Sequence, residues 1–205
     1  QTNEKKDLKE VQDGKNEEYS EEDEFNLSLA AMEEEIKPQV ISTIDVLSKN
    51  YLKLIKYQNE KLNCSLNDTE FSRTKENSYK KIQNELIEKI TTLQLNQSIL
   101  ENLVQDHYQE NKKIITLESL LMRLVVENKV SREEFLKYYL GNEINPNFQS
   151  LIDKNAALKN CFRKRKKEFT EIREKLIKFS QKIGLPIGEF KKLVSKIQKG
   201  DKETG

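Results

Sequence analysis

Apolar residues recur at intervals of three and four positions along almost the whole chain from Leu29 onward. This spacing places them on one face of an α-helix, so it predicts a succession of amphipathic helices. The most regular stretch runs from Leu158 to Ile183 in alternating steps of four and three, and only Arg165 interrupts its apolar series. Such a heptad pattern predicts one continuous helix with an apolar seam.

Turn-forming residues are too few for a fold built of many strands. The 205 residues include six Gly and three Pro, whereas a sandwich or barrel needs a turn after each short strand. We therefore expect an all-α fold, an irregular multi-helix bundle with long antiparallel helices. The expected helices cover approximately residues 29–62, 71–93, 97–128, 132–140, 146–152, 158–183 and 187–197.

Local signals set several of the expected helix ends. Asn96 is placed to cap the helix that follows it, and Ser131 forms a capping-box pattern with Glu134. Gly184 closes the long seam helix, because glycine readily adopts the left-handed conformation of a helix stop. Pro38 leaves two alternatives open, a kinked first helix or a short helix followed by a second one that begins at the proline.

Acidic and basic residues are distributed unevenly along the chain. Residues 1–35 hold 13 acidic and 4 basic side chains, and the remaining 170 residues hold 22 acidic and 32 basic ones. With almost nothing to bury, residues 1–26 are expected to be a disordered acidic linker. Residues 27–200 are expected to form the helical domain, and residues 201–205 a C-terminal tail.

The sequence predicts no enzyme, metal site or cofactor. It contains no phosphate-binding Gly-rich loop, no nucleophile elbow and no zinc motif. His107 falls on or beside an apolar helix face, which favours a packed side chain. Cys64 and Cys161 are far apart in the sequence and are expected to be free thiols in a reducing cytoplasm. The most apolar stretch is short and contains Arg123, so we expect no membrane span.

Five consecutive cations form the strongest candidate for a binding surface: Arg163, Lys164, Arg165, Lys166 and Lys167. They cover more than one helical turn and could contact nucleic-acid phosphates or an acidic protein surface. The alternative is a solvated helix face that Glu168, Glu171 and Glu174 partly balance. Base-specific readout is not predicted, because no short element presents Asn, Gln and Arg together.

Four landmarks in fixed order carry a resemblance to a known family. They are residues 26–40 (NLSLAAMEEEIKPQV) after an acidic run; residues 93–97 (LQLNQ); Phe135-Leu136 with residues 141–143 and Phe148; and residues 183–190 (IGLPIGEF) leading to 198–200 (QKG). From about residue 25 to residue 205, the chain resembles the non-conserved region of alphaproteobacterial primary sigma factors, of the sigma-70 family. Two departures are Phe148, where the family usually has tryptophan, and Pro186, where it usually has a Ser or Thr cap.

The resemblance implies a non-catalytic helical module inserted before the domain of the sigma factor that opens the promoter. Residues 201–205 would then lead to that domain. The implied partners are core RNA polymerase, in particular its largest subunit, and promoter DNA through the parent protein, with the segment itself monomeric and cytoplasmic. The alternative is a free-standing helical adaptor, or a coiled-coil tether that pairs through the seam of residues 158–183.

Overall fold

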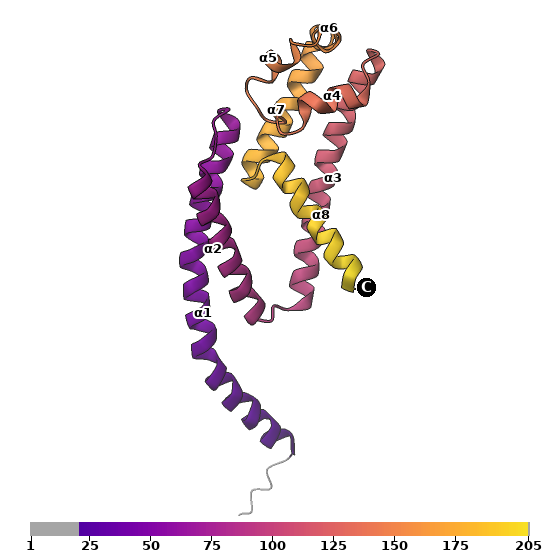
Figure 1. Cartoon of the computed structure of the whole chain (residues 1–205). Helices are drawn as coiled ribbons and strands as arrows, with labels where there is room; N and C mark the ends of the chain where they lie inside the picture. Colours follow the sequence, from indigo (N-terminus) through magenta and orange to yellow (C-terminus); the bar gives the residue numbers. More distant parts are fainter. Residues whose placement is uncertain (1–20, 205) are drawn as a thin grey trace, which may run out of the picture. The chain divides into compact units, whose positions relative to one another are not determined.

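The computed structural model describes residues 21–204, and every regular element in that range is an α-helix (Figure 1). The helices are α1 (Glu21–Leu66), α2 (Arg73–Thr92), α3 (Gln97–Glu127), α4 (Arg132–Tyr139), α5 (Phe148–Ile152), α6 (Ala156–Lys164), α7 (Lys166–Ile183) and α8 (Ile187–Thr204). The all-α prediction is confirmed. None of these helices combines the length and apolar content that a membrane crossing needs.

The chain divides into two compact units between Ser42 and Thr43, and each is described by itself. The described part of the first unit is the beginning of α1, which starts at Glu21, inside the segment expected to be a disordered linker. Residues 1–20 of that predicted linker lie outside the described residues. Helix α1 continues through Pro38, so the alternative of two separate helices is wrong. The proline removes one backbone donor, whereas the hydrogen bonds of the long helix continue on both sides of it.

The local signals place most helix ends in the second unit correctly. The side chain of Asn96 accepts a hydrogen bond from the Ser98 amide at 2.9 Å, and Ser131 Oγ accepts one from the Glu134 amide at 3.2 Å. Gly184 follows α7 with a φ of 80°, the left-handed stop that the sequence predicted. At the C-terminus, α8 extends to Thr204, so it includes residues 201–204 of the predicted C-terminal tail.

The prediction of one continuous helix over residues 158–183 is wrong. Helix α6 ends at Lys164, α7 begins at Lys166, and Arg165 between them has φ −119° and ψ 29°. The rings of Phe162 and Phe169 stack with their centroids 3.7 Å apart, and both are buried. The change of direction at Arg165 therefore serves the packing of two aromatic rings that a straight helix would hold farther apart.

The core of the second unit lies where α3 to α8 meet. Helix α3 packs against α4, α6, α7 and α8, and Leu62 of α1 joins the same cluster. Its fully buried side chains include Ile114, Leu121, Val125, Phe135, Ile152, Leu158, Phe169, Leu176, Ile187 and Val194. Because the apolar positions of α6 and α7 are buried in this core, little of the predicted seam is left for pairing with a second chain.

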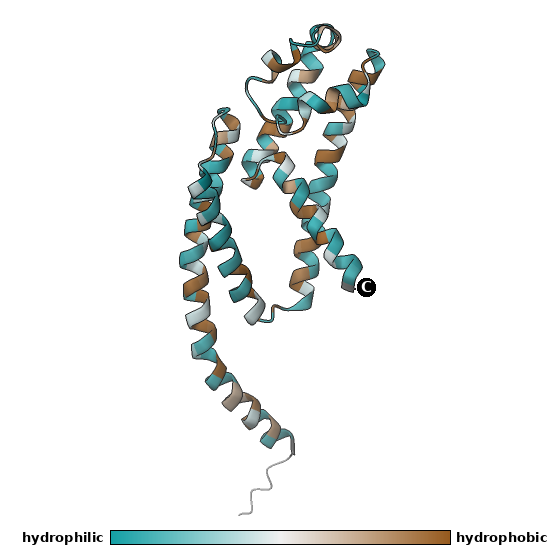
Figure 2. Cartoon of the chain, in the orientation of Figure 1, coloured by the Kyte–Doolittle hydropathy of each residue, from teal (hydrophilic) through white to brown (hydrophobic). Residues whose placement is uncertain are grey.

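Helices α1 and α2 are joined to the rest of the second unit by polar contacts near their connecting turn. Lys61 forms ion pairs with Glu76 of α2 at 3.0 Å and with Glu189 of α8 at 2.5 Å. Asp68 accepts hydrogen bonds from Asn145 and Asn147, each at 2.9 Å. Helix α2 itself buries only Tyr79 and Leu86, and Figure 2 shows it hydrophilic over most of its length.

Candidate electrostatic interface

The five predicted cations lie around the junction of α6 and α7. Helix α6 buries Leu158, Cys161 and Phe162, so Arg163 and Lys164 point away from the core and are exposed. In α7 the first inward residue is Phe169, and Lys166 and Lys167 are exposed before it. Four of the five cations therefore face solvent.

Arg165 differs from its neighbours because it is half-buried and paired. Its guanidinium donates to Glu168 at 3.1 Å and to Glu127, at the end of α3, at 3.0 Å. All three side chains remain more than a third exposed, so each pair contributes at most about 1 kcal/mol. Arg165 thus joins the α6–α7 junction to the end of α3 and is less available to a partner than the others.

The remaining cations of the run have few partners within the chain. Arg163 Nη2 donates to Asn160 Oδ1 at 3.2 Å. In the described part of the chain, Lys164, Lys166 and Lys167 form no ion pair. Their charge is therefore not neutralised by neighbouring carboxylates. Of Glu168, Glu171 and Glu174, only Glu168 pairs with a cation of the run, Arg165, among the described residues.

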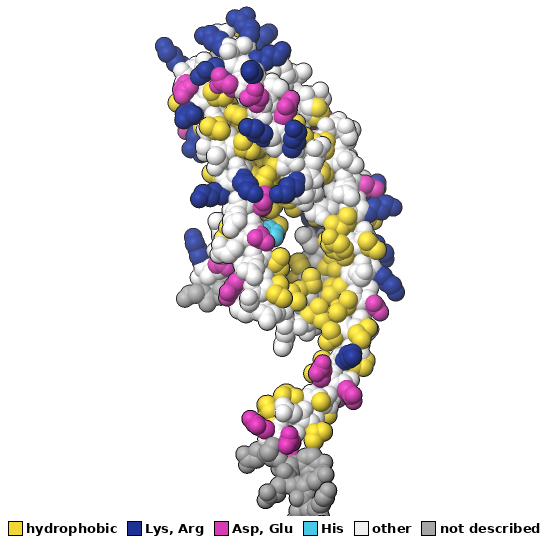
Figure 3. All heavy atoms as spheres, turned by 180° about the vertical axis from the view of Figure 1, so that it is seen from behind, with side chains coloured by type: hydrophobic (Ala, Val, Ile, Leu, Met, Phe, Trp, Pro, Cys, Tyr) yellow, Lys and Arg dark blue, Asp and Glu magenta, His cyan; other side chains and the backbone are white. Residues whose placement is uncertain are grey.

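Further cations from other segments enlarge this surface. Lys154 and Lys159 flank the start of α6, and Lys129 follows α3; all three are exposed. Residues 153–168 hold seven cations and two carboxylates, so their sum is positive. We call Lys129, Lys154, Lys159 and residues 163–167 the basic end. Figure 3 shows Lys and Arg side chains gathered over the part of the second unit where α5, α6 and the start of α7 lie.

The helix dipole favours Arg163 and Lys164, which lie in the last turn of α6, but it does not explain the position of Lys166 and Lys167. Lys166 and Lys167 occupy the first turn of α7, where the partial positive charge of a helix N-terminus disfavours a cation by about 0.3–1 kcal/mol. Only Glu168 in that turn has the favourable sign. Because Lys166 and Lys167 reduce helix stability where they stand, the position of these two lysines fits an external anionic surface better than it fits the needs of the fold.

The thiol of Cys161, beside this region, and the imidazole of His107, in the first half of α3, both have partners within the fold. Burial raises the pKa of the Cys161 thiol, and the nearby Arg165 and Lys164 offset this only in part. The thiol therefore stays neutral and unreactive. His107 is half-buried, its Nδ1 lies 2.6 Å from the Leu103 carbonyl, and its ring stacks on Phe190. The predicted packed histidine is confirmed.

Sequence reasoning found the run of five cations and missed the other three. Lys129, Lys154 and Lys159 lie in different segments, and no spacing rule joins them. The only local signals were the turns beside them, at Asn128 after α3 and at Asn155, which caps α6 by accepting from the Ala157 and Leu158 amides at 3.0 Å. Within residues 21–204, no three His, Cys, Asp or Glu side chains are grouped as a metal site requires.

The chain is similar to a known protein family. A family model described as "Sigma-70, non-essential region" matches residues 1–179. The match covers most of the chain, includes every residue of the basic end, and stops within α7 before α8 begins.

Proposed function

The chain belongs to the family of the sigma-70 non-essential region, and from that premise we propose that it is a non-catalytic helical module through which a primary sigma factor contacts core RNA polymerase. Sigma-70 factors act with RNA polymerase in transcription initiation, so the family is one of transcription-factor segments and not of enzymes. An alphaproteobacterial origin, a cytoplasmic location and a contact with the largest polymerase subunit are parts of this proposal.

The observation that carries the proposal is the unneutralised charge of the basic end. Lys164, Lys166 and Lys167 are exposed and have no carboxylate partner among the described residues. The helices behind them are fixed by a buried aromatic core, which holds the cations in place. A charged surface on a rigid frame raises the rate and specificity of association with an oppositely charged surface.

The coiled-coil tether has less support than the sigma-factor module. Leu158, Phe169 and Leu176 of the predicted seam are almost completely buried within the chain. A dimer through the seam would require these residues to leave the core, at a cost of several kcal/mol for each large side chain removed.

The test is a charge reversal in the sigma factor that contains this chain. The triple variant K164E/K166E/K167E should bind core polymerase about three- to tenfold more weakly at about 0.1 M salt, because the electrostatic attraction becomes repulsion. Titration of fluorescently labelled sigma factor with core enzyme measures the affinity. The matched control is K53E/K81E/K89E, which reverses three exposed lysines of α1 and α2.

The salt dependence separates an electrostatic contact from misfolding. The difference between the variant and the unmodified factor should shrink as salt approaches 1 M, where the screening length falls to about 3 Å. Equal affinities at low salt, or an equal loss in the control, would contradict the proposal. If core binding is unchanged and the holoenzyme instead loses affinity for non-specific duplex DNA, the basic end faces the DNA backbone.

A further inference from the structure

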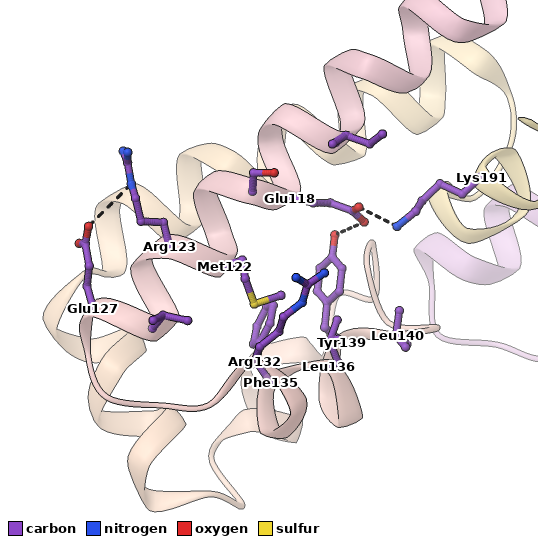
Figure 4. A pocket seen from close by; sticks show the side chains of 13 residues that line it. Glu118, Met122, Arg123, Glu127, Arg132, Phe135, Leu136, Tyr139, Leu140 and Lys191 are labelled. Carbon is purple, nitrogen blue, oxygen red and sulfur yellow. Dashed lines mark hydrogen bonds and ion pairs between the residues drawn. The ribbon is translucent and has the colours of Figure 1, made fainter. Parts of the chain in front are cut away.

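A groove with a volume of about 590 Å³ runs between α3 and α4. Its apolar walls are Ile115, Met122 and Val126 from α3, Phe135 and Leu136 from α4, and Leu140 directly after α4. Figure 4 shows these two helices facing each other across it, with Lys191 of α8 at one end. Phe135 is buried beneath the groove, so its floor belongs to the core and is rigid.

Three apolar side chains at the edges of the groove are exposed. Ile115, Val126 and Leu140 are 49%, 54% and 57% exposed. In a chain in which 35% of the residues are charged, three exposed apolar side chains around one groove form a patch typical of a binding site. No described segment of the chain covers them.

The two carboxylates beside the groove are satisfied within the chain. Glu118 accepts from Tyr139 Oη at 3.0 Å and pairs with Lys191 at 2.6 Å. Glu127 pairs with Arg165 at 3.0 Å and with Arg123 at 3.7 Å. Because both carboxylates already pair with cations of the chain, neither needs a cation from a partner.

Arg132 on the α4 wall has the opposite character. It is exposed, lines the groove and makes no hydrogen bond or ion pair with the described residues; Figure 4 draws no interaction from it. A free guanidinium beside an apolar surface is suited to a carboxylate, which it binds through two parallel hydrogen bonds. The groove therefore presents the positive charge of Arg132 to a partner, which can complement it with a carboxylate.

The length of the groove fits a short helix. Ile115 and Val126 are eleven positions apart on α3, which at 1.5 Å per residue is about 16 Å, or three helical turns. We propose that the groove binds an amphipathic helix of a partner protein, about three turns long, with apolar residues on one face and a carboxylate that meets Arg132. This is the helix-in-groove mode of recognition, and it does not depend on which partner the basic end contacts.

The probe is a fluorescent helical peptide of about 14 residues, with Leu at positions i, i+4 and i+7 and one Glu beside that face. It is titrated into the whole 205-residue chain, and anisotropy is expected to show saturable binding. Val126→Asp should weaken binding at least tenfold, because it places a charge in the apolar wall. Val46→Asp is the matched control, since Val46 is 40% exposed on α1 outside the groove, and it should bind like the unmodified chain.

A charge swap tests the carboxylate. Arg132→Glu should weaken the Glu peptide about tenfold, and a peptide with Lys in place of Glu should bind R132E better than the unmodified chain. The two methionines, Met122 in the groove and Met32 in α1, give a second readout. In methyl NMR spectra the Met122 signal should shift on peptide addition while the Met32 signal stays in place.

Several results would overturn the proposal: no saturable binding, binding insensitive to Val126→Asp, or equal binding of both peptides to the unmodified chain. Another is a concentration-dependent dimer in sedimentation that V126D abolishes, which would make the groove a contact between two copies. The K164E/K166E/K167E variant should keep the peptide affinity at about 0.15 M salt. A negative result for peptide binding to the groove can therefore be distinguished from a negative result for polymerase binding to the basic end.

Discussion

The hydroxyl group of Tyr139 is the clearest case of one residue whose chemistry is set by its surroundings. The side chain is 2% exposed and donates to Glu118 across the contact between α4 and α3. Burial raises the pKa of Tyr139 far above its usual value, the negative charge of Glu118 adds to this effect, and Arg173 opposes it weakly. The phenol therefore stays protonated and remains a donor to Glu118.

This pKa shift predicts how stability depends on alkaline pH. The pKa of Tyr139 is higher in the folded than in the unfolded chain, so its contribution to stability is complete below about pH 10 and decreases above it. Tyrosinate absorbance of the folded chain up to about pH 10.5 should contain no signal from Tyr139. The variant Y139F should therefore give the same absorbance change as the unmodified chain. A smaller change in Y139F would show that Tyr139 ionises in the fold.

At the scale of the element, local chemistry and tertiary packing decide different helix ends. Asn96, Ser131 and Gly184 could be identified from the sequence, because a cap or a left-handed stop depends on residues within one turn. The break at Arg165 could not be predicted, since it depends on the stacking of Phe162 on Phe169 in the folded core. The heptad pattern is the same with or without that break.

Substitutions at two glycines, one that ends α7 and one within α8, test the role of the left-handed stop. Gly184 has a φ of 80° and open space where a Cβ would lie, so only backbone strain opposes a side chain there. Gly184→Ala should lower the free energy of unfolding by about 1–2 kcal/mol. Gly200 lies in α8 with the same open space but no positive φ, so Gly200→Ala should raise it by about 0.5–1 kcal/mol. Urea unfolding measures both, and equal effects would contradict this account.

At the scale of the whole molecule, the sequence predicted the all-α class and showed the uneven distribution of charge. It did not predict the full basic end or the groove between α3 and α4. The basic end joins Lys129 to Lys154 and Lys159, and the groove joins α3 to α4. Such sets depend on which helices pack together, and periodicity along one helix carries no information about its neighbours. The run of residues 163–167 could be found because its members are adjacent in the chain.

The division into two units predicts unequal protection of backbone amides. Phe25, Leu29 and Met32, in the described part of the first unit, are 64%, 48% and 57% exposed, whereas Ile114 and Leu121 of α3 are almost fully buried. Hydrogen exchange should therefore be much faster in residues 21–42 than in residues 114–125, because local opening exposes little new apolar surface there. Mass spectrometry of peptic peptides measures both segments in one experiment. Equal exchange rates would show that one cooperative unit includes them both.

The shallow burial of α2 has a consequence for sequence drift. Only Tyr79 and Leu86 of its twenty residues are buried, so packing restrains substitution strongly at two positions and weakly at most others. The helix must still begin after Ser72 and reach Leu93 to connect α1 with α3. Over evolutionary time, the length and register of α2 are therefore more constrained than the identity of its residues. Two descendants of this chain could differ at most positions of α2 while keeping the same helix.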